Sequence, residues 1–381
     1  MQIVGILAFV VALLLSVMVH EFGHYVMAKK YGMKVSEFFL GFGKRLWSTR
    51  RGETEFGIKA IPAGGYCRIE GMAPDDQMAI GEESRAFYKA SSGRKLIVLG
   101  AGSFLHFVLA YLLLFILFAA IGTTQALPVV NQIVPKSGAQ IAGIKAGDEI
   151  TAINGKSVTN WPRDVLAIRN SGGKELTLVI KRGLERISIT AQPKEELIDG
   201  KKRWILGIIN SYGLKRSNPI TAIKNSAIAT RDLTKSSFTA LAQLPARIPS
   251  LWGQTVGGEV RDPNGLVGIV GVARVSGQAV GSDRLTLGER IATFILIIAS
   301  LNIFVGIFNL LPILPLDGGH MAVTIADEIR AFFARLRGRP RPAGIDVTTL
   351  TPITLVVFVI LVALTVLLLI ADIVNPVNLN L

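Results

Sequence analysis

The chain has 381 residues, half of them hydrophobic, and a mean hydropathy of +0.48. Such a composition excludes an ordinary soluble domain and is typical of proteins embedded in a membrane. The formal net charge is +14, but no stacking aromatic residues alternate with the basic ones, so a nucleic-acid partner is not expected.

Four apolar runs lie at residues 3–19, 96–121, 291–316 and 350–371. Each has, or nearly has, the roughly 20 residues that cross a bilayer as a helix. The first run has no charged side chain before it and no small-residue cleavage site after it, so a retained span is expected rather than a signal peptide. We therefore predict a polytopic α-helical membrane protein with about four transmembrane helices.

His20, Glu21 and His24 lie at the end of the first run, in the order His-Glu-x-x-His. On a helix, this spacing places both imidazoles on one face, one turn apart, where they can share a Zn²⁺ ion, and it places the glutamate near the metal's water. Two histidines in an apolar helix can also be structural core residues. The metal interpretation is favoured because the chain has only four histidines and because ionisable groups at membrane depth are usually functional.

The region after the first span contains a glycine-rich loop at residues 41–43 and two short alternating stretches at 55–62 and 65–69. The two stretches predict the strands of a small hairpin against the membrane face. Cys67, the single cysteine, excludes an intrachain disulfide and a cysteine-based zinc site.

Residues 127–193 have a mixed pattern typical of a soluble domain. Gly-Ile-Lys-Ala-Gly-Asp-Glu-Ile at 143–150 leads into an apolar strand, and Asn154-Gly155 then predicts a type I′ hairpin turn. The order of these glycines, the acidic residue and the hairpin resembles a PDZ domain of the bacterial protease type. We therefore predict an inserted PDZ domain, a β-rich α+β fold, at 122–195.

The following region, 196–288, is predicted to be an extracytoplasmic linker with an amphipathic segment. Residues 220–236 have helical spacing and favour a helix lying on the outer membrane surface. Residues 265–281 are apolar and glycine-rich but too short to span a bilayer. Two interpretations stay open for them: a re-entrant or packed segment, or an irregular linker.

Basic residues gather in two loops of modest length, one after the first apolar run and one after the third. The positive-inside rule places both loops in the cytoplasm, so both termini and the large central region are predicted to be extracytoplasmic. The predicted order is a first span at 1–30, a cytoplasmic loop with the hairpin at 31–95, a second span at 96–121, the PDZ domain at 122–195, the linker at 196–288, a third span at 289–320, a basic cytoplasmic loop at 321–349, and a fourth span with the C-terminus at 350–381. The basic residues are Lys29, Lys30, Lys34, Lys44, Arg45, Arg50, Arg51, Lys59 and Arg68 in the first loop, and Arg330, Arg335, Arg337, Arg339 and Arg341 in the second.

A catalytic zinc normally has a third protein ligand and an open position for water. Asp317 is the candidate, in the stretch Asn-Leu-Leu-Pro-Ile-Leu-Pro-Leu-Asp-Gly-Gly-His at 309–320. The predicted topology brings the ends of the first and third spans to the same membrane face, where Asp317 can meet His20 and His24. Proline and glycine interrupt the helix there, which is tolerated at membrane depth only where the backbone is packed in protein or lines a cavity.

The motif in the first span, together with Asn-x-x-Pro-x-x-Pro-Leu-Asp-Gly-Gly-His in the third, resembles the site-2 protease family of intramembrane metalloproteases. The Gly-Phe-Gly loop, the Gly-Gly-Tyr hairpin at 64–66 and a PDZ domain between the second and third spans resemble its bacterial regulator-of-sigma-factor branch. The resemblance implies that His20, His24 and Asp317 ligate Zn²⁺ and that Glu21 is the catalytic base.

The resemblance also implies a substrate site and a substrate class. Asn309 is expected to hold the substrate or its oxyanion, and the hairpin around Gly65 and Tyr66 is expected to pair with an unwound substrate segment by strand addition. The expected reaction is cleavage of membrane segments of single-span proteins, such as an anti-sigma factor already cut by a site-1 protease, or a remnant signal peptide. The protein is expected in the bacterial plasma membrane, with its active site near the cytoplasmic side. Whether the PDZ domain binds a trimmed C-terminus or acts as a size filter stays open.

The remaining two histidines of the chain are not expected to ligate the metal. His106 stands where many relatives have an asparagine near the start of the second span, and a core position is favoured over a metal ligand. His320 is expected to lie beside Asp317 and to support this ligand without binding the metal itself.

Two other functions are disfavoured. An inert PDZ-bearing scaffold is disfavoured because the base and all three ligands are present. A transporter with broken helices is disfavoured because the chain has no two related halves.

Overall fold

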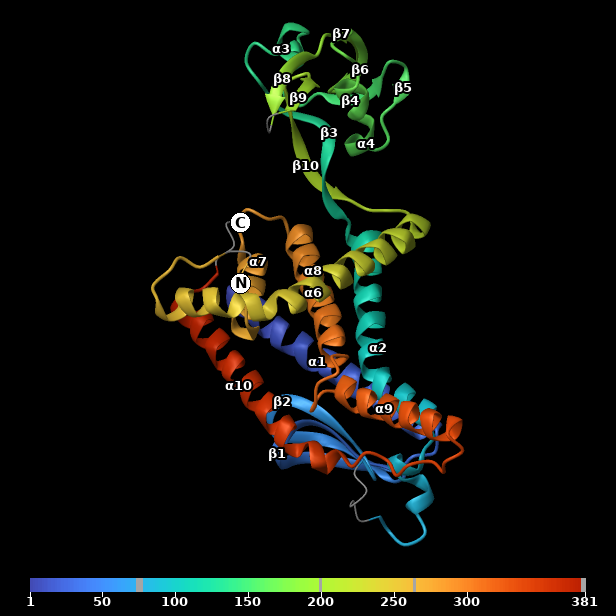
Figure 1. The fold of residues 1–381 in the computed structure, drawn as a ribbon. Coiled ribbons are helices and arrows are strands. Elements are labelled where there is room, and N and C mark those ends of the chain that lie inside the picture. The colour runs from blue at the N-terminus through green and yellow to red at the C-terminus, as the bar shows by residue number, and fades with distance from the viewer. Residues whose placement is uncertain (73–77, 199–200, 263–264, 378–381) are drawn as a thin grey trace. The chain divides into compact units, whose positions relative to one another are not determined.

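The computed structural model describes residues 1–72, 78–198, 201–262 and 265–377. The chain divides into two compact units, one formed by Met1–Ala120 with Asn218–Leu381 and the other by Ile121–Ser217. The first unit consists of helices and one hairpin, whereas the second consists mainly of strands (Figure 1).

Four helices of the first unit are long and apolar enough to cross a membrane. Most of their apolar surface is exposed, as expected where lipid rather than protein surrounds a helix. The predicted polytopic helical fold with four spans and an inserted β-rich region is therefore confirmed. The helices are α1 (Gln2–Lys30), α2 (Ser92–Ile116, continued by a π-helical turn, Leu117–Ile121), α8 (Leu287–Asn309) and α10 (Thr351–Val374, preceded by the 3₁₀ turn η4, Val347–Leu350).

Two further helices of this unit, α6 (Pro219–Val256) and α7 (Ile269–Gly281), occupy much of the region predicted as a linker. The helix expected at 220–236 is present and continues to Val256. Of the two interpretations for 265–281, the packed segment is correct, because α7 lies against α1 with glycines at the contact. A Cβ added at Gly277 would lie 2.9 Å from the carbonyl oxygen of Gln2, so the two helices approach as closely as small residues allow.

The hairpin of the first unit consists of β1 (Val35–Arg51) and β2 (Thr54–Ile69). The prediction that 55–62 and 65–69 pair with each other is wrong, since both stretches belong to β2 and both pair with β1. Leu40 lies opposite Ile58 on one side and Gly65 on the other. The cause is a bend within β2 at Pro62 and Gly64, where Gly64 has a φ of 146°. The glycines at 41–43 lie within β1 rather than in a loop.

This pairing leaves 65–69 at an edge of the sheet. These residues pair with 35–40 on one side, and in the described part of the chain no strand pairs with their other side. An edge strand has unpaired backbone groups that can accept a further strand.

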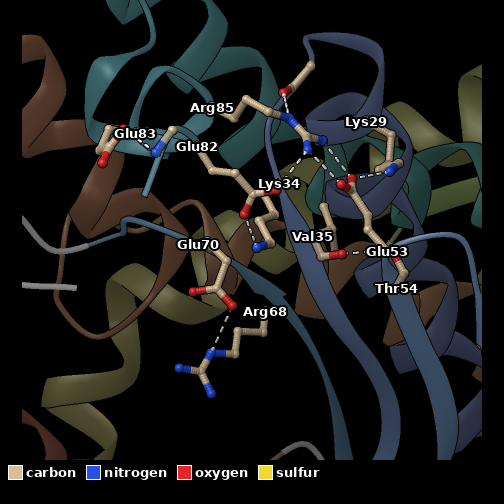
Figure 2. A network of polar contacts seen from close by, with 12 residues as sticks. Lys29, Lys34, Val35, Glu53, Thr54, Arg68, Glu70, Glu82, Glu83 and Arg85 are labelled. Carbon is tan, nitrogen blue, oxygen red and sulfur yellow. Dashed lines mark hydrogen bonds and ion pairs between the residues drawn. The ribbon is translucent and has the colours of Figure 1, made fainter. Parts of the chain in front are cut away.

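The turn of the hairpin is tied to the end of α1 and to a 3₁₀ turn, η1 (Glu83–Arg85), which a second such turn, η2 (Phe87–Lys89), follows. Figure 2 shows the polar network that does this. Arg85 donates from Nη1 and Nη2 to the two carboxylate oxygens of Glu53 at 2.7 Å each, and Lys29 at the end of α1 donates to the same carboxylate. Because the hydrogen bonds from Arg85 and then from Lys29 favour the ionised form, the pKa of Glu53 falls from 4.5 to about 2.

We expect the Glu53→Gln substitution to loosen the hairpin above pH 5, at a cost of about 1–2 kcal/mol for the lost charge-assisted bonds. The folded pKa is depressed, so the stabilisation is complete above 4.5 and fades as the pH falls toward 2. Pepsin cleavage of the hairpin in the variant should therefore exceed that in the native chain at pH 5, and the two rates should converge near pH 2. A ratio that stays constant between these pH values would contradict this role of Glu53.

The second unit contains a sheet in the order β10-β3-β4-β6-β7, with β5 beside β4, and a two-stranded β8–β9 ribbon. Asn154 and Gly155 both have positive φ between the paired residues Ile153 and Lys156, which confirms the predicted type I′ turn. The elements are β3 (Thr123–Ile133), α3 (Gly138–Ile141), β4 (Glu149–Ile153), β5 (Lys156–Ser157), α4 (Trp161–Asp164), α5 (Leu166–Arg169), β6 (Leu176–Arg182), β7 (Glu185–Ala191), β8 (Lys194–Ile198), β9 (Lys201–Ile205) and β10 (Ile208–Lys215).

The C-terminal boundary predicted at residue 195 is too early for this unit. β10 pairs with β3 along most of its length, from Ile208 opposite Ile133 to Lys215 opposite Thr123. Leu206, just before β10, is buried in the same core as Val130 and Ile150. The unit therefore extends to Ser217, because its first strand finds its partner only in the last one.

Candidate active site

His20 and His24 are buried side chains on the face of α1 that packs against α2. Two glycines allow this packing. A Cβ added at Gly23 would lie 2.5 Å from the carbonyl oxygen of Ala101, and one added at Gly102 would lie 2.5 Å from Nε2 of His24 and 2.6 Å from the ring of His20. The helices can therefore meet at this point only without side chains, and the space gained holds the two imidazoles.

Asp317 reaches the same place from the other end of the chain. α8 ends at Asn309, the chain turns through Pro312 and Pro315, and α9 (Asp317–Leu336) begins with the aspartate itself. Oδ2 of Asp317 lies 3.1 Å from Nε2 of His20 and 3.3 Å from Nε2 of His24. The break predicted from proline and glycine is thus present, and it delivers the carboxylate to the two histidines.

The three ligand atoms fit a single metal ion. The two Nε2 atoms are 3.0 Å apart, and the other two separations are 3.1 and 3.3 Å. A tetrahedral zinc with bonds of about 2.0–2.1 Å has ligand atoms about 3.3–3.4 Å apart. The side chain of His24 is also oriented for this role: its Nδ1 donates to the carbonyl oxygen of Val98 at 2.8 Å, which leaves the Nε2 lone pair directed at the group.

Burial raises the pKa of the Cys67 thiol in the nearby hairpin, so the single cysteine stays protonated.

A cavity of about 220 Å³ opens beside this group. Glu21 and Asn309, both predicted as site residues, line it together with His20 and Asp317. The backbone amide of Cys67 in the hairpin is hydrogen-bonded to the Glu21 carboxylate. The cavity therefore combines a candidate metal site, a carboxylate that is not one of the three converging ligands, and an amide side chain.

Of the two hairpin residues predicted to bind substrate, Gly65 lies next to the Glu21 side chain. A Cβ added at Gly65 would lie 2.9 Å from Sδ of Met18 and 3.5 Å from Cγ of Glu21. The Tyr66 side chain is held inside the hairpin instead, where its hydroxyl bonds Glu37 and Lys59. At this edge, then, backbone rather than the tyrosine ring is placed next to Glu21.

Sequence reasoning missed a buried polar chain behind the cavity. His106 lines the cavity, and its Nδ1 donates to Oδ1 of Asn302 at 2.8 Å. The amide of Asn302 donates in turn to the hydroxyl of Ser16 at 3.1 Å and to the carbonyl of Ile298. His106 therefore belongs to a network that joins α2, α8 and α1. The available signal in the sequence was an asparagine inside an apolar run. The structure shows that this residue, Asn302, is fully buried.

His320, expected near Asp317, lies one turn further along α9. Within the described residues no hydrogen bond joins its imidazole to Asp317.

We expect the Asn302→Leu substitution to destabilise the helix bundle by about 1–2 kcal/mol, the upper range for interhelical hydrogen bonds in membranes. Leucine has a similar size but leaves Nδ1 of His106 without an acceptor. Unfolding in mixed detergent micelles measures the difference. The matched control is Ser300→Ala, because among the described residues the Ser300 hydroxyl bonds the carbonyl of Leu296 in its own helix and no other helix. Equal stability of the two variants would contradict the role of Asn302.

Fold and site together define a class: a polytopic membrane protein with a buried candidate metal centre built from His-Glu-x-x-His on one helix and a carboxylate after another. Comparison with known proteins then specifies the family. The chain belongs to peptidase family M50, whose family model matches residues 8–349. This confirms the resemblance to intramembrane metalloproteases seen in the sequence.

The similarity to known proteins covers the whole chain or nearly all of it. It is 32% identical to "Zinc metalloprotease Rip1" of Mycobacterium tuberculosis, over 100% of this chain and 99% of that protein. It is also 32% identical to "Zinc metalloprotease Rip1" of Mycolicibacterium smegmatis, over 99% of this chain and 98% of that protein.

Proposed function

We propose that the chain is an intramembrane zinc endopeptidase in which His20, His24 and Asp317 hold the metal and Glu21 is the general base. The observation that carries the proposal is the convergence of three ligand atoms, none more than 3.3 Å from the next, beside a cavity that Glu21 lines. The family, and the zinc metalloprotease names of relatives that cover the whole chain, support the same conclusion.

A bound zinc ion would polarise the scissile carbonyl and would lower the pKa of its bound water to near neutrality. Glu21 then accepts the proton of the attacking water and delivers it to the leaving nitrogen. The backbone N–H of Cys67 donates to the Glu21 carboxylate, which lines the cavity. Asn309 lines the same cavity, where its side-chain N–H groups can donate to the oxyanion that develops on the carbonyl.

The proposed substrate is the membrane segment of a single-span protein, such as an anti-sigma factor pre-cut by a site-1 protease or a remnant signal peptide. A helical segment hides its carbonyls in hydrogen bonds, so it must unwind before attack. The free edge at 65–69 offers the unwound segment backbone partners by strand addition. Because Gly65 lies against Glu21, a segment added there passes the base.

We propose a bacterial plasma membrane location with both termini extracytoplasmic and the active site near the cytoplasmic side. The support is the concentration of basic residues in the hairpin region and after α9. The inserted unit would then face the outside. Its strand order and its type I′ turn are consistent with the proposed PDZ domain, which would bind a trimmed C-terminus or exclude large ectodomains.

Co-reconstitution of the full-length protein with a single-span substrate in liposomes tests this function. Mass spectrometry of the products should locate the cut within the membrane segment, and removal of zinc with a chelator should stop it. Zinc-loaded protein that leaves such substrates intact, while hydrolysing soluble peptides, would contradict the proposal.

We expect the Gly65→Val substitution to slow cleavage by about tenfold to a hundredfold, the cost of displacing a reacting group by about 1 Å. The valine side chain would push on Met18 and Glu21 and crowd the edge, but it touches no proposed metal ligand. Zinc content should therefore stay unchanged. Gly93→Val is the matched control, since a Cβ at Gly93 meets nothing within 4 Å; equal loss of activity in both variants would rule out a role for the edge.

A further inference from the structure

α9 presents an apolar face that the described protein does not cover. Ala331 and Ala334 are buried, at 3% and 9% exposure, and α9 packs against α2. Larger side chains on α9 are 45–67% exposed, namely Ile325, Ile329, Phe332, Phe333 and Leu336. A helix with one small, packed face and one large, apolar, exposed face is typical of a helix lying in a membrane interface.

The end of this helix is strongly basic. The twelve residues from 330 to 341 contain five arginines, Arg330, Arg335, Arg337, Arg339 and Arg341, and no acidic residue. The run contains no lysine. The planar guanidinium group of arginine can bind two oxygens of a phosphate group in a bidentate hydrogen bond.

A helix cap holds two of these arginines in place. Gly338 has a φ of 65°, its amide donates to the carbonyl of Arg335, and the amide of Arg339 donates to the carbonyl of Ala334 at 2.8 Å. This is a Schellman cap, which satisfies the last carbonyls of the helix. Consequently Arg337 and Arg339 leave the helix end in a defined geometry, on either side of the glycine.

Arg335, Arg337 and Arg339 are the arginines of this run for which the described structure contains no ion pair. Arg341 is bound to Glu328 at 2.5 Å, and Arg330 lies 3.4 Å from Asp327. In the part of the chain that the structure describes, neither Arg337 nor Arg339 forms an ion pair. Two guanidinium groups held close together without a counter-charge favour binding of an anion.

A cavity of about 450 Å³ lies at this helix end. Arg330, Arg337 and Arg339 line it together with Ile329, Phe333 and Pro340. The charged groups therefore share one hollow with apolar side chains that continue into the exposed face of α9. The negative end of the helix dipole opposes an anion here, but its half charge is smaller than the combined charge of Arg337 and Arg339.

We propose that this hollow binds the headgroup of an acidic phospholipid from the cytoplasmic leaflet. The guanidinium groups of Arg337 and Arg339 bind the phosphodiester, and the acyl chains lie along Phe333 and Ile329. The exposed apolar face favours a lipid over a soluble polyanion, which would leave that face in water. The site rests on the four-span fold and on the cytoplasmic placement of 321–349, and it needs neither zinc nor peptidase activity.

Native mass spectrometry of the full-length protein, released from detergent with equal amounts of phosphatidylglycerol and phosphatidylcholine of the same chains, tests the site. The native protein should retain phosphatidylglycerol preferentially. The Arg337→Gln/Arg339→Gln variant should bind it about thirtyfold more weakly, since each basic residue near an acidic membrane surface contributes about fivefold. The Arg337→Lys/Arg339→Lys variant, which keeps the charge but loses the bidentate bonds, should fall between the two.

The matched control is Arg186→Gln/Arg216→Gln, which removes the same charge from exposed positions of the inserted unit and should retain the lipid as the native protein does. Equal retention of both lipids by the native protein, or an equal loss in the control variant, would overturn the site. Displacement of phosphatidylglycerol by millimolar inorganic phosphate would also overturn it, because the hollow would then recognise free phosphate rather than a lipid.

Discussion

The Glu21→Gln protein is expected to bind zinc as the native protein does and to cleave a reconstituted single-span substrate about a thousandfold more slowly, the typical effect of removing a general base. Glutamine keeps the size of the side chain and an oxygen that can accept the bond from the Cys67 amide. It cannot accept a proton from water. The three converging ligand atoms belong to other residues, so the metal site should be unaffected.

Cleavage products quantified by mass spectrometry, with zinc measured on the same sample, give both readouts. Glu83→Gln, at an exposed glutamate of η1, is the matched control and should retain activity. Undiminished cleavage by the Glu21→Gln protein would remove Glu21 from the mechanism, whereas loss of zinc would make it a ligand instead of a base.

The Asp317→Ala protein is expected to bind zinc more than about a hundredfold more weakly, since even residues that only support a ligand contribute 10–100-fold. Loss of this carboxylate leaves two imidazoles on one helix, and the link between α1 and the start of α9 is broken. Activity should disappear with the metal. Competition with a zinc chelator of known affinity measures the change.

The matched control is Asp327→Ala, further along the same helix. That carboxylate bonds Arg330 and the amide of Ile345 and no ligand residue, so zinc affinity should not change. Native zinc affinity in the Asp317→Ala protein would mean that the third ligand lies elsewhere.

The spans and the histidine motif could be predicted because their signals are local. A run of apolar residues and an i, i+4 pair of histidines depend on neighbouring residues alone. Asp317 required one further step, the charge pattern of the loops, which placed the ends of two distant spans on one membrane face. The structure brings Asp317 to within 3.3 Å of His20 and His24.

The hairpin could not be predicted in the same way, because its pairing is set by contacts distant in the chain. Leu40 pairs on both sides, with Ile58 and with Gly65, and nothing in the alternation of 55–62 shows that β1 inserts between the two halves of β2. The glycines at 41–43 indicated a loop by composition. Gly41 has a φ of 86° within β1, and a Cβ there would lie 2.7 Å from the carbonyl of Ile61, so glycine is required inside the strand.

The end of the inserted unit and the network behind the cavity were missed for related reasons. β10 follows β3 by more than seventy residues and has no periodic signal that separates it from a linker. Asn302 was visible as a polar residue in an apolar run, but its partners His106 and Ser16 lie on two other helices. Only the packing of α2, α8 and α1 shows that the three side chains meet.

X-ray absorption at the zinc K-edge of the purified, full-length protein tests the central claim most directly. The chain has four histidines and one cysteine, so the count of imidazole and sulfur ligands is informative. We predict two imidazole nitrogens with oxygen ligands at about 2.0–2.2 Å and no sulfur at about 2.3 Å. A third imidazole, a single imidazole or a sulfur ligand would contradict a site built from His20, His24 and Asp317.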